Sequence, residues 1–251
     1  MSADISSTVR VALVTGAGQG MGLGIARKLA QAGCRVVIND YDAVRAKSAA
    51  EQLKSEGFDA YAIGCDVTSY DAVLKMKQAI AEHWGNVDIL VNNVGIPHDG
   101  MQRKAFLEMP PNEWDRLLDI NIKSALNCCS VFAGDMCAKG WGRIISIVSE
   151  SWRSGSGAAA GVSLYAAGKG AVVGFSRQLS SELAGAGVTV NCISLGLMDN
   201  VPGAERAIRA IPMGRLGTAN DAGHCAVFLA SEDAGWITGQ CIPVNGGVLV
   251  S

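Results

Sequence analysis

Short β-branched runs alternate with longer helical stretches along the chain, and this order constrains the fold more than any other feature. Seven apolar runs predict strands, at Val9–Thr15, Arg35–Asp40, Ala60–Val67, Asp88–Val94, Arg143–Ser149, Val188–Ser194 and Cys241–Val244. Helices are expected between them, for example at Gly22–Ala32, Ala43–Glu56 and Tyr70–Trp84. Strand–helix alternation predicts a parallel sheet, and strands that are apolar throughout predict helices on both of its faces.

No composition shift, repeat or long linker divides the 251 residues, so we expect a single domain over 1–251. The least regular stretches, 149–164 and 195–217, both follow predicted strands. Ligand crevices of open α/β sheets form at such positions, and we therefore predict that these two stretches are the variable substrate loops.

The composition excludes several classes of protein. With 21 Lys and Arg against 23 Asp and Glu and no cationic run, the chain lacks the charge that nucleic acid or an anionic membrane requires. It shows no leader pattern and no run of about 18 apolar residues, so we expect a soluble, cytoplasmic protein. The eight cysteines form no CxxC pair and have no histidine at ligand spacing, which predicts buried thiols and no metal site.

A glycine-rich turn follows the first strand, in the order Thr15-Gly-Ala-Gly-Gln-Gly-Met-Gly22. Glycines allow a sharp turn and bring backbone N–H groups and a helix N-terminus against a pyrophosphate. The residues expected at the phosphates are Gly16, Gln19, Gly20 and Met21. A tight strand-to-helix turn that binds no ligand can have the same sequence pattern, but the preceding strand and the following helix favour a dinucleotide site.

An acid at the end of the second strand, Asp40, predicts which dinucleotide binds. It lies 24 residues beyond Gly16, where a carboxylate accepts hydrogen bonds from both ribose hydroxyls and repels a 2′-phosphate. The glycine turn contains no Arg or Lys and Tyr41 follows the acid, so we expect no cation nearby to neutralise that phosphate. The prediction is therefore NAD rather than NADP; the alternative is that Asp40 only caps the next helix.

Three motifs occur in one order over essentially the whole chain: TGxxxGxG, Asn92-Asn93-Val94-Gly95 after the fourth strand, and Tyr165-x-x-x-Lys169. Together they resemble the short-chain dehydrogenase/reductase family, in which the second motif has Ala where this chain has Val94. The resemblance implies a Rossmann-type doubly wound domain with a seven-stranded parallel sheet. It also implies an oxidoreductase, commonly a homotetramer.

The resemblance implies that Tyr165 is the acid/base of the reaction. A phenol with a pKa near 10 is a poor base at neutral pH, and Lys169, one helical turn on, can stabilise its phenolate. Ser149, at the end of the fifth strand, would polarise the substrate oxygen, with Ser151 as the alternative. Asn121 would support a water that links Lys169 to solvent; otherwise it only satisfies a buried carbonyl.

The same resemblance gives the remaining cofactor contacts. Asp66 and Val67 would contact adenine, and Asn93 and Gly95 would line the adenosine ribose. After the sixth strand the family's Pro-Gly and Thr are replaced by the stretch Leu195–Asn200. Met198 and the backbone there would hold the nicotinamide amide, with Asn200 in place of the Thr.

Substrate would lie against Tyr165, with walls from Ile96, His98, Ser151, Trp152, Leu195, Met198 and Val201. Aromatic and thioether groups favour a hydrophobic or cyclic alcohol, although each of them could instead pack in the core. Arg153, Arg206 and Arg209 either recognise an anionic substrate group or lie on a solvated face.

The prediction from sequence is an NAD-dependent enzyme that interconverts a secondary alcohol and its ketone. The expected substrate is a hydrophobic or cyclic alcohol or a polyol. Two alternatives stay open: an NADPH-type 3-ketoacyl thioester reductase, and a non-catalytic dinucleotide sensor on the same fold. The only partners expected are a small alcohol or ketone and other copies of the chain, because the tail Thr238–Ser251 is apolar.

Overall fold

A computed structural model describes residues 9–96, 100, 103–155 and 161–250. The strands are β1 (Val11–Val14), β2 (Arg35–Asp40), β3 (Ala60–Gly64), β4 (Ile89–Asn92), β5 (Gly142–Ser149), β6 (Val188–Leu195) and β7 (Cys241–Val244). The α-helices are α1 (Gly20–Gln31), α2 (Ala43–Ser55), α3 (Tyr70–Trp84), α4 (Trp114–Leu118), α5 (Ser124–Lys139), α6 (Ser163–Leu183) and α7 (Ala219–Ala230). No helix in these ranges is long and apolar enough to cross a membrane.

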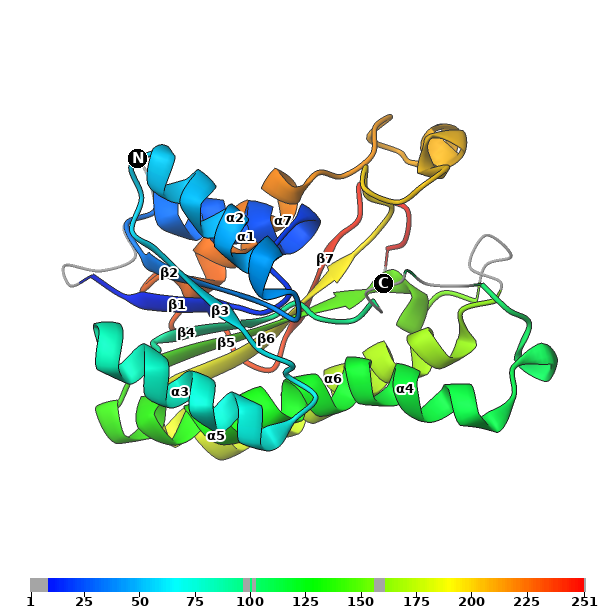
Figure 1. The fold of residues 1–251 in the computed structure, drawn as a ribbon. Helices are drawn as coiled ribbons and strands as arrows, with labels where there is room; N and C mark the ends of the chain where they lie inside the picture. Colours follow the sequence, from blue (N-terminus) through cyan, green and yellow to red (C-terminus); the bar gives the residue numbers. More distant parts are fainter. Residues whose placement is uncertain (1–8, 97–99, 101–102, 156–160, 251) are drawn as a thin grey trace.

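The seven strands form one parallel sheet in the order β3-β2-β1-β4-β5-β6-β7 (Figure 1). This confirms the predicted Rossmann-type fold. Strands β2 and β7 have the predicted bounds, whereas β3 ends at Gly64 rather than Val67. It stops there because β2, its only partner, ends at Asp40, which is paired with Gly64. The chain beyond has no strand to bond to.

Helices cover both faces of the sheet because every central strand is apolar on both sides. In Figure 1, α1, α2 and α7 lie on one face, and α3, α5 and α6 lie on the other. Alternate residues of β1 enter different cores: Ala12 and Val14 pack with the first helical layer, and Val11 and Leu13 pack with the second. The two cores hold the sheet rigid between the layers and fix where each strand ends.

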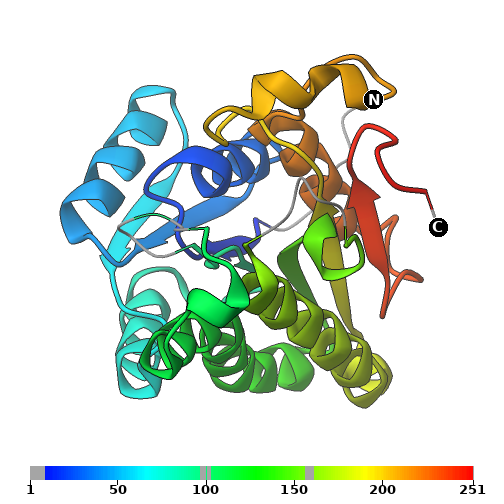
Figure 2. The ribbon, with the colours of Figure 1, turned by 90° about the vertical axis from the view of Figure 1, so that its right-hand side faces the viewer.

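The carboxyl ends of all seven strands lie at the same edge of the sheet, since the strands are parallel. Figure 2 faces this edge, with the layer of α1, α2 and α7 (blue and orange) above and that of α3, α5 and α6 (cyan to yellow-green) below. Every motif singled out in the sequence follows one of these strand ends or begins a helix of the lower layer. The fold therefore gathers the candidate residues at one edge.

Candidate active site

The glycine-rich turn between β1 and α1 has the shape that a pyrophosphate requires. Gly16 and Gly20 have φ of 60° and 57°, which only glycine adopts without strain. A side chain on Gly22 would collide with the carbonyl of Gly16. Helix α1 begins at Gly20, so its free N–H groups point out of a turn that has no side chain in the way. These residues fit the phosphates of a dinucleotide.

The side chain of Asn93 holds this turn against the end of β4. Its Nδ2 donates to the carbonyl oxygens of Thr15 and Gly16, at 3.0 and 3.1 Å. The backbone N–H of Asn93 donates to the hydroxyl of Thr15 at 3.0 Å. The amide of Asn93 thus positions the turn, which is a role that the sequence analysis did not assign; its predicted contact with the adenosine ribose stays a prediction.

Asp40 ends β2 beside the glycine turn and is 4% exposed. Its Oδ2 accepts a hydrogen bond from the Gly18 N–H at 3.0 Å, and its Oδ1 accepts one from the Asp42 N–H at 3.0 Å. A side chain on Gly18 would come within 2.6 Å of Oδ2. The helix cap at α2 is Asp42, whose side chain accepts from two N–H groups there, so Asp40 is not the cap. Its carboxylate is instead fixed beside the glycine turn, and its contact with the ribose stays a prediction.

A cation does lie next to this acid, contrary to the prediction from sequence. Arg45, in the first turn of α2, donates to Asp40 Oδ1 from Nη2 at 2.6 Å and from Nε at 3.2 Å. The hydrogen bond to Asp40 raises the pKa of Arg45. The prediction considered only the glycine turn and Tyr41. It did not take into account that the first turn of α2 brings Arg45 back over the end of β2.

The predicted adenine contacts lie just beyond β3. The Asp66 side chain accepts from the N–H and hydroxyl of Thr68, at 2.9 and 2.7 Å, and so shapes the turn into α3. Val67 is buried in the core between the sheet and the α3–α5 layer. Asp66 and Val67 thus lie at the carboxyl edge of the sheet. A contact with adenine itself stays a prediction.

Tyr165 lies in the first turn of α6, next to Ser149 at the end of β5. Burial raises the pKa of Tyr165 above its ordinary value of 10.0, and a hydrogen bond with Ser149 partly offsets this rise. We expected the nearby Lys169 to lower this pKa, but in the chain alone desolvation of the phenolate dominates. The expected lowering of the Tyr165 pKa is therefore not seen in the chain alone.

The two candidate serines occupy different positions. Ser149 contacts Tyr165, whereas Ser151 lies in the 3-10 turn Glu150–Trp152 and donates its N–H to Ser149 Oγ at 3.3 Å. The hydroxyl of Ser151 is buried, with no hydrogen-bond partner among the described residues. The geometry favours Ser149 as the residue that shares a substrate oxygen with Tyr165. Its catalytic role stays a prediction.

Lys169 is buried at 4% exposure behind Tyr165, with its ammonium 5.7 Å from the centre of the tyrosine ring. Its Nζ donates to the carbonyl of Ile147 at 2.9 Å and to that of Val94 at 3.4 Å. Desolvation by burial lowers the pKa of Lys169 from 10.5 to about 8. A side chain on Gly95 would collide with this ammonium, so Gly95 leaves the space that Lys169 fills.

Asn121 lies in a π-helical turn, Asp119–Lys123, between α4 and α5. Its Nδ2 donates to the Leu117 carbonyl at 2.9 Å, which supports the alternative that it satisfies a buried carbonyl. Its Oδ1 is buried without a partner among the described residues, and it would lie 3.0 Å from a Cβ on Gly95, the atom that would also meet Lys169. The oxygen therefore points into the space beside the lysine ammonium. Its predicted support of a water that links Lys169 to solvent stays a prediction.

The predicted apolar substrate wall is largely part of the core. Leu195 and Met198 are buried in the core that packs on α1 and α7, and Met198 is bridged to Gly217. Trp152 packs against the cluster of Val148, Val172 and Cys192. Burial supports the packing alternative for Leu195 and Met198, because the turn after β6 folds back onto the sheet. Trp152 is half-buried, so both interpretations of it stay open. Ile96 is exposed, and His98 and residues 156–160 lie outside the described residues.

The three arginines that were candidate anion ligands differ in their surroundings. Arg153 donates from Nε to Glu150 Oε2 at 2.8 Å, and both side chains are largely buried. This ion pair was not predicted from the sequence. It uses Nε, whereas Nη2 of Arg153 is buried without a hydrogen-bond partner among the described residues. Arg206 and Arg209 are exposed on the 3-10 helix Ala204–Ala210, as a solvated face requires.

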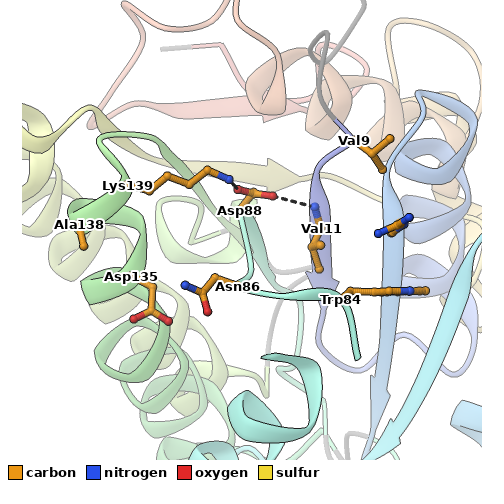
Figure 3. Close-up of a pocket in the computed structure, with 9 residues that line it drawn as sticks. Val9, Val11, Trp84, Asn86, Asp88, Asp135, Ala138 and Lys139 are labelled. Atoms are coloured by element: carbon orange, nitrogen blue, oxygen red, sulfur yellow. Dashed lines mark hydrogen bonds and ion pairs between the residues drawn. The ribbon is translucent and has the colours of Figure 1, made fainter. Parts of the chain in front are cut away.

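A hollow of about 510 Å³ lies at the opposite edge of the sheet, beside the starts of β1 and β4 (Figure 3). It is lined by Val9, Val11, Arg35, Trp84, Asn86, Asp88, Asp135, Ala138 and Lys139. The buried Asp88 carboxylate accepts from the Val11 N–H at 2.9 Å and pairs with Lys139 and Arg10. These partners tie β4 to β1 and to the end of α5, so the polar groups there have structural roles. The candidate active site is at the other edge.

Comparisons with known proteins identify the class to which this fold and site belong. A family model described as enoyl-(acyl carrier protein) reductase matches residues 16–249. The chain is 35% identical over 245 residues to (2S)-[(R)-hydroxy(phenyl)methyl]succinyl-CoA dehydrogenase subunit BbsD of Thauera aromatica, covering 95% of this chain and 96% of that protein. It is also 35% identical over 245 residues to the 3-oxoacyl-[acyl-carrier-protein] reductase FabG of Staphylococcus aureus, covering 94% and 97% of the two chains.

Among solved structures, a gluconate 5-dehydrogenase from Burkholderia cenocepacia, in complex with NADP and tartrate, superposes with a TM-score of 0.88. It is 30% identical, and the match covers 98% of this chain and 97% of that chain. The TM-score shows that the fold is shared. The chain belongs to the short-chain dehydrogenase/reductase family of oxidoreductases.

Proposed function

We propose that this protein is an NAD-preferring dehydrogenase that interconverts a secondary alcohol and its ketone. The observation that carries the proposal is the group formed by Tyr165, Ser149 and the buried ammonium of Lys169, placed at the same edge of the sheet as Asp40. A nicotinamide dinucleotide, when bound, accepts or supplies the hydride. The chain must then bind the substrate and handle its hydroxyl proton.

In the proposed reaction, Tyr165 takes the proton from the alcohol oxygen, or returns one to the ketone oxygen in the reverse direction. Ser149 donates a hydrogen bond to the same oxygen and holds it beside the phenol. The Lys169 ammonium stabilises the phenolate, and the positive charge of oxidised nicotinamide adds to this effect. Asn121, through a water beside Lys169, would connect the proton to solvent.

The preference for NAD rests on Asp40. Its carboxylate is oriented by four N–H donors, from Gly18, Asp42 and Arg45. Oδ2 accepts only one of them and so retains acceptor capacity for a ribose hydroxyl. A 2′-phosphate would meet this negative charge at close range. Arg45 reduces the repulsion, because it neutralises part of the carboxylate. We therefore expect a preference for NAD that is measurable but smaller than an unpaired acid would give.

For the substrate, we propose a secondary alcohol that carries a ring or several hydroxyls. The named relatives support this class: one is a dehydrogenase of a hydroxy(phenyl)methyl thioester, and another is a dehydrogenase of the polyhydroxy acid gluconate. Leu195 and Met198 pack in the interior, whereas Ile96 is exposed and Trp152 is half-buried. Ile96 and Trp152 would therefore supply the apolar contacts to a ring. Specificity would then arise from the loops 149–164 and 195–217.

A second candidate is an NADPH-type reductase of 3-ketoacyl thioesters. Arg45 favours it, since its guanidinium at the end of β2 is a group that binds phosphate. The similarity to FabG points the same way.

A homotetramer is also proposed, on the ground that Trp236, Val248 and Val250 leave apolar surface exposed near α7 and β7.

The experiment is a panel of cyclic, aryl, polyol and hydroxy-acid alcohols with NAD⁺ and NADP⁺, together with ketoacyl thioesters and each reduced cofactor. Turnover of one alcohol group with NAD⁺ supports the proposal. Faster turnover of thioesters with NADPH would favour the second candidate. Binding of NAD without turnover of any compound would favour the sensor that the sequence left open.

A further inference from the structure

Two cysteines face each other across the last two strands of the sheet. Cys192 of β6 and Cys241 of β7 are directly paired in the parallel register. Neighbouring strands lie about 4.8 Å apart, which is within the Cα separations of about 4.4–6.8 Å that disulfides span. Paired residues direct their side chains to the same face, and both cysteines belong to the cluster between the sheet and α6.

The two thiols are in hydrogen-bonding contact, and their surroundings differ. Cys241 is partly exposed on the edge strand β7. The hydrogen bond with Cys192 lowers the pKa of Cys241, and the cations Arg177 and Arg153 lower it further, whereas burial and the charge of Glu150 oppose this. Cys192 is buried, and the pKa of its thiol is raised by the contact with Cys241 and by burial. Cys241 is thus the thiol that ionises first.

The other cysteines lack this arrangement. All eight lie within the described ranges, and no other two are paired on adjacent strands. Cys128 and Cys129 are neighbours in α5, but consecutive helical residues do not face each other. Cys225 is partly exposed, but burial raises its pKa to about 11. A reactive thiol with a second thiol in contact occurs at the β6–β7 pair alone.

We propose that Cys192 and Cys241 are a site of reversible oxidation, which a peroxide converts to a cross-strand disulfide. The Cys241 thiolate attacks one peroxide oxygen, which forms a sulfenic acid and releases the other oxygen as hydroxide or water. The Cys192 sulfur then attacks the sulfenic sulfur, its proton leaves, and water is expelled as the S–S bond forms. Two thiols lose two electrons and two protons, and one peroxide is reduced to two waters.

The proposal does not depend on the proposed dehydrogenase activity, because the readout is covalent. The purified full-length chain is treated with hydrogen peroxide and quenched. Free thiols are then counted under denaturing conditions, and the cross-linked peptides are mapped by mass spectrometry. We expect the thiol count to fall from eight to six, with a mass loss of about 2 Da. One disulfide should link Cys192 to Cys241, and dithiothreitol should restore both thiols.

Variants identify the pair. Cys241→Ser, at a partly exposed position, should abolish the bridge, and Cys192→Ser should leave Cys241 as a sulfenic or sulfinic acid. Cys225→Ser is the matched control, since it removes a partly exposed thiol without a partner and should still form the bridge. Circular dichroism confirms that each variant is folded. The proposal is overturned if the wild-type chain keeps eight thiols, if Cys241 is oxidised further while Cys192 stays free, or if another pair is linked.

Discussion

Gly95 leaves the space that the Lys169 ammonium occupies, so the substitution Gly95→Ala is a direct test of how that ammonium is positioned. The backbone at Gly95 is outside the left-handed region, and alanine therefore fits it without backbone strain. The added methyl would overlap Nζ, come within 2.8 Å of Cε, and lie 3.0 Å from Asn121 Oδ1. The lysine side chain must move, because it is the flexible partner in this contact.

The expected cost follows from the hydrogen bonds that the ammonium makes. Moving Nζ away from Gly95 weakens its bond to Val94, at 3.4 Å, and shifts the one to Ile147, at 2.9 Å. Loss of one charge-assisted hydrogen bond costs about 1.5–3 kcal/mol. If the displaced ammonium stabilises the phenolate less by this amount, kcat/KM falls by about 10- to 150-fold. Cofactor affinity should change little, since Asp40 and the glycine turn are not touched.

The assay compares kcat/KM and the dissociation constant for NAD⁺ in the wild type and the variant, with Gly174→Ala as control. Gly174 lies in α6, five residues after Lys169, and a Cβ there meets no atom within 4 Å. This control should keep full turnover and gain about 1 kcal/mol of stability from helix propensity. Wild-type turnover in a folded Gly95→Ala protein would refute the reasoning that the position of Lys169 limits catalysis.

Three further predictions concern the charges at the site. Arg45→Gln should weaken NADP⁺ binding by about 10-fold and change NAD⁺ binding much less, because the guanidinium reduces the repulsion between Asp40 and a 2′-phosphate, which NAD⁺ lacks. Equal changes in the two dissociation constants, measured by calorimetry, would contradict this. Asp40→Ser should shift the preference towards NADP⁺. An unchanged ratio of the dissociation constants for NAD⁺ and NADP⁺ would show that Asp40 does not discriminate between a ribose hydroxyl and a 2′-phosphate. The pKa of Lys169 is about 8 in the folded protein and 10.5 in the unfolded chain. Between pH 8 and 10.5, Lys169 is therefore mostly neutral in the folded protein and mostly protonated in the unfolded chain. The unfolding free energy relative to Lys169→Met should therefore rise by about 3 kcal/mol over that window, and a constant difference in urea titrations would count against the buried ammonium.

The sequence predicts the sheet well because its signals are local. An apolar run on both faces requires a covered parallel strand, and the bounds of β2 and β7 follow from this directly. The end of β3 could not be predicted, since it depends on where β2 stops offering hydrogen bonds. The glycine turn and Asp40 are also local, and the structure places them side by side as expected.

The positions at which the prediction and the structure differ depend on contacts between segments. Arg45 reaches Asp40 only because α2 begins with a turn that brings it back over β2. Leu195 and Met198 lie at or after the end of β6, as substrate-contacting residues often do, yet the chain there folds back onto the sheet and buries them. The π-helical turn at Asn121 likewise has no simple sequence signal, although it orients the side chain towards Lys169. Tertiary packing, rather than local pattern, decides these positions.

The central claim is that Tyr165 is the acid/base of a nicotinamide-dependent alcohol oxidation. The most direct measurement follows the absorbance of reduced nicotinamide during oxidation of the best alcohol from the panel, by the wild type and by Tyr165→Phe, with NAD⁺ binding measured in both. We predict that the variant binds NAD⁺ as tightly as the wild type and loses about 10²- to 10⁴-fold in kcat. A Tyr165→Phe protein that binds NAD⁺ and retains full turnover would contradict the account.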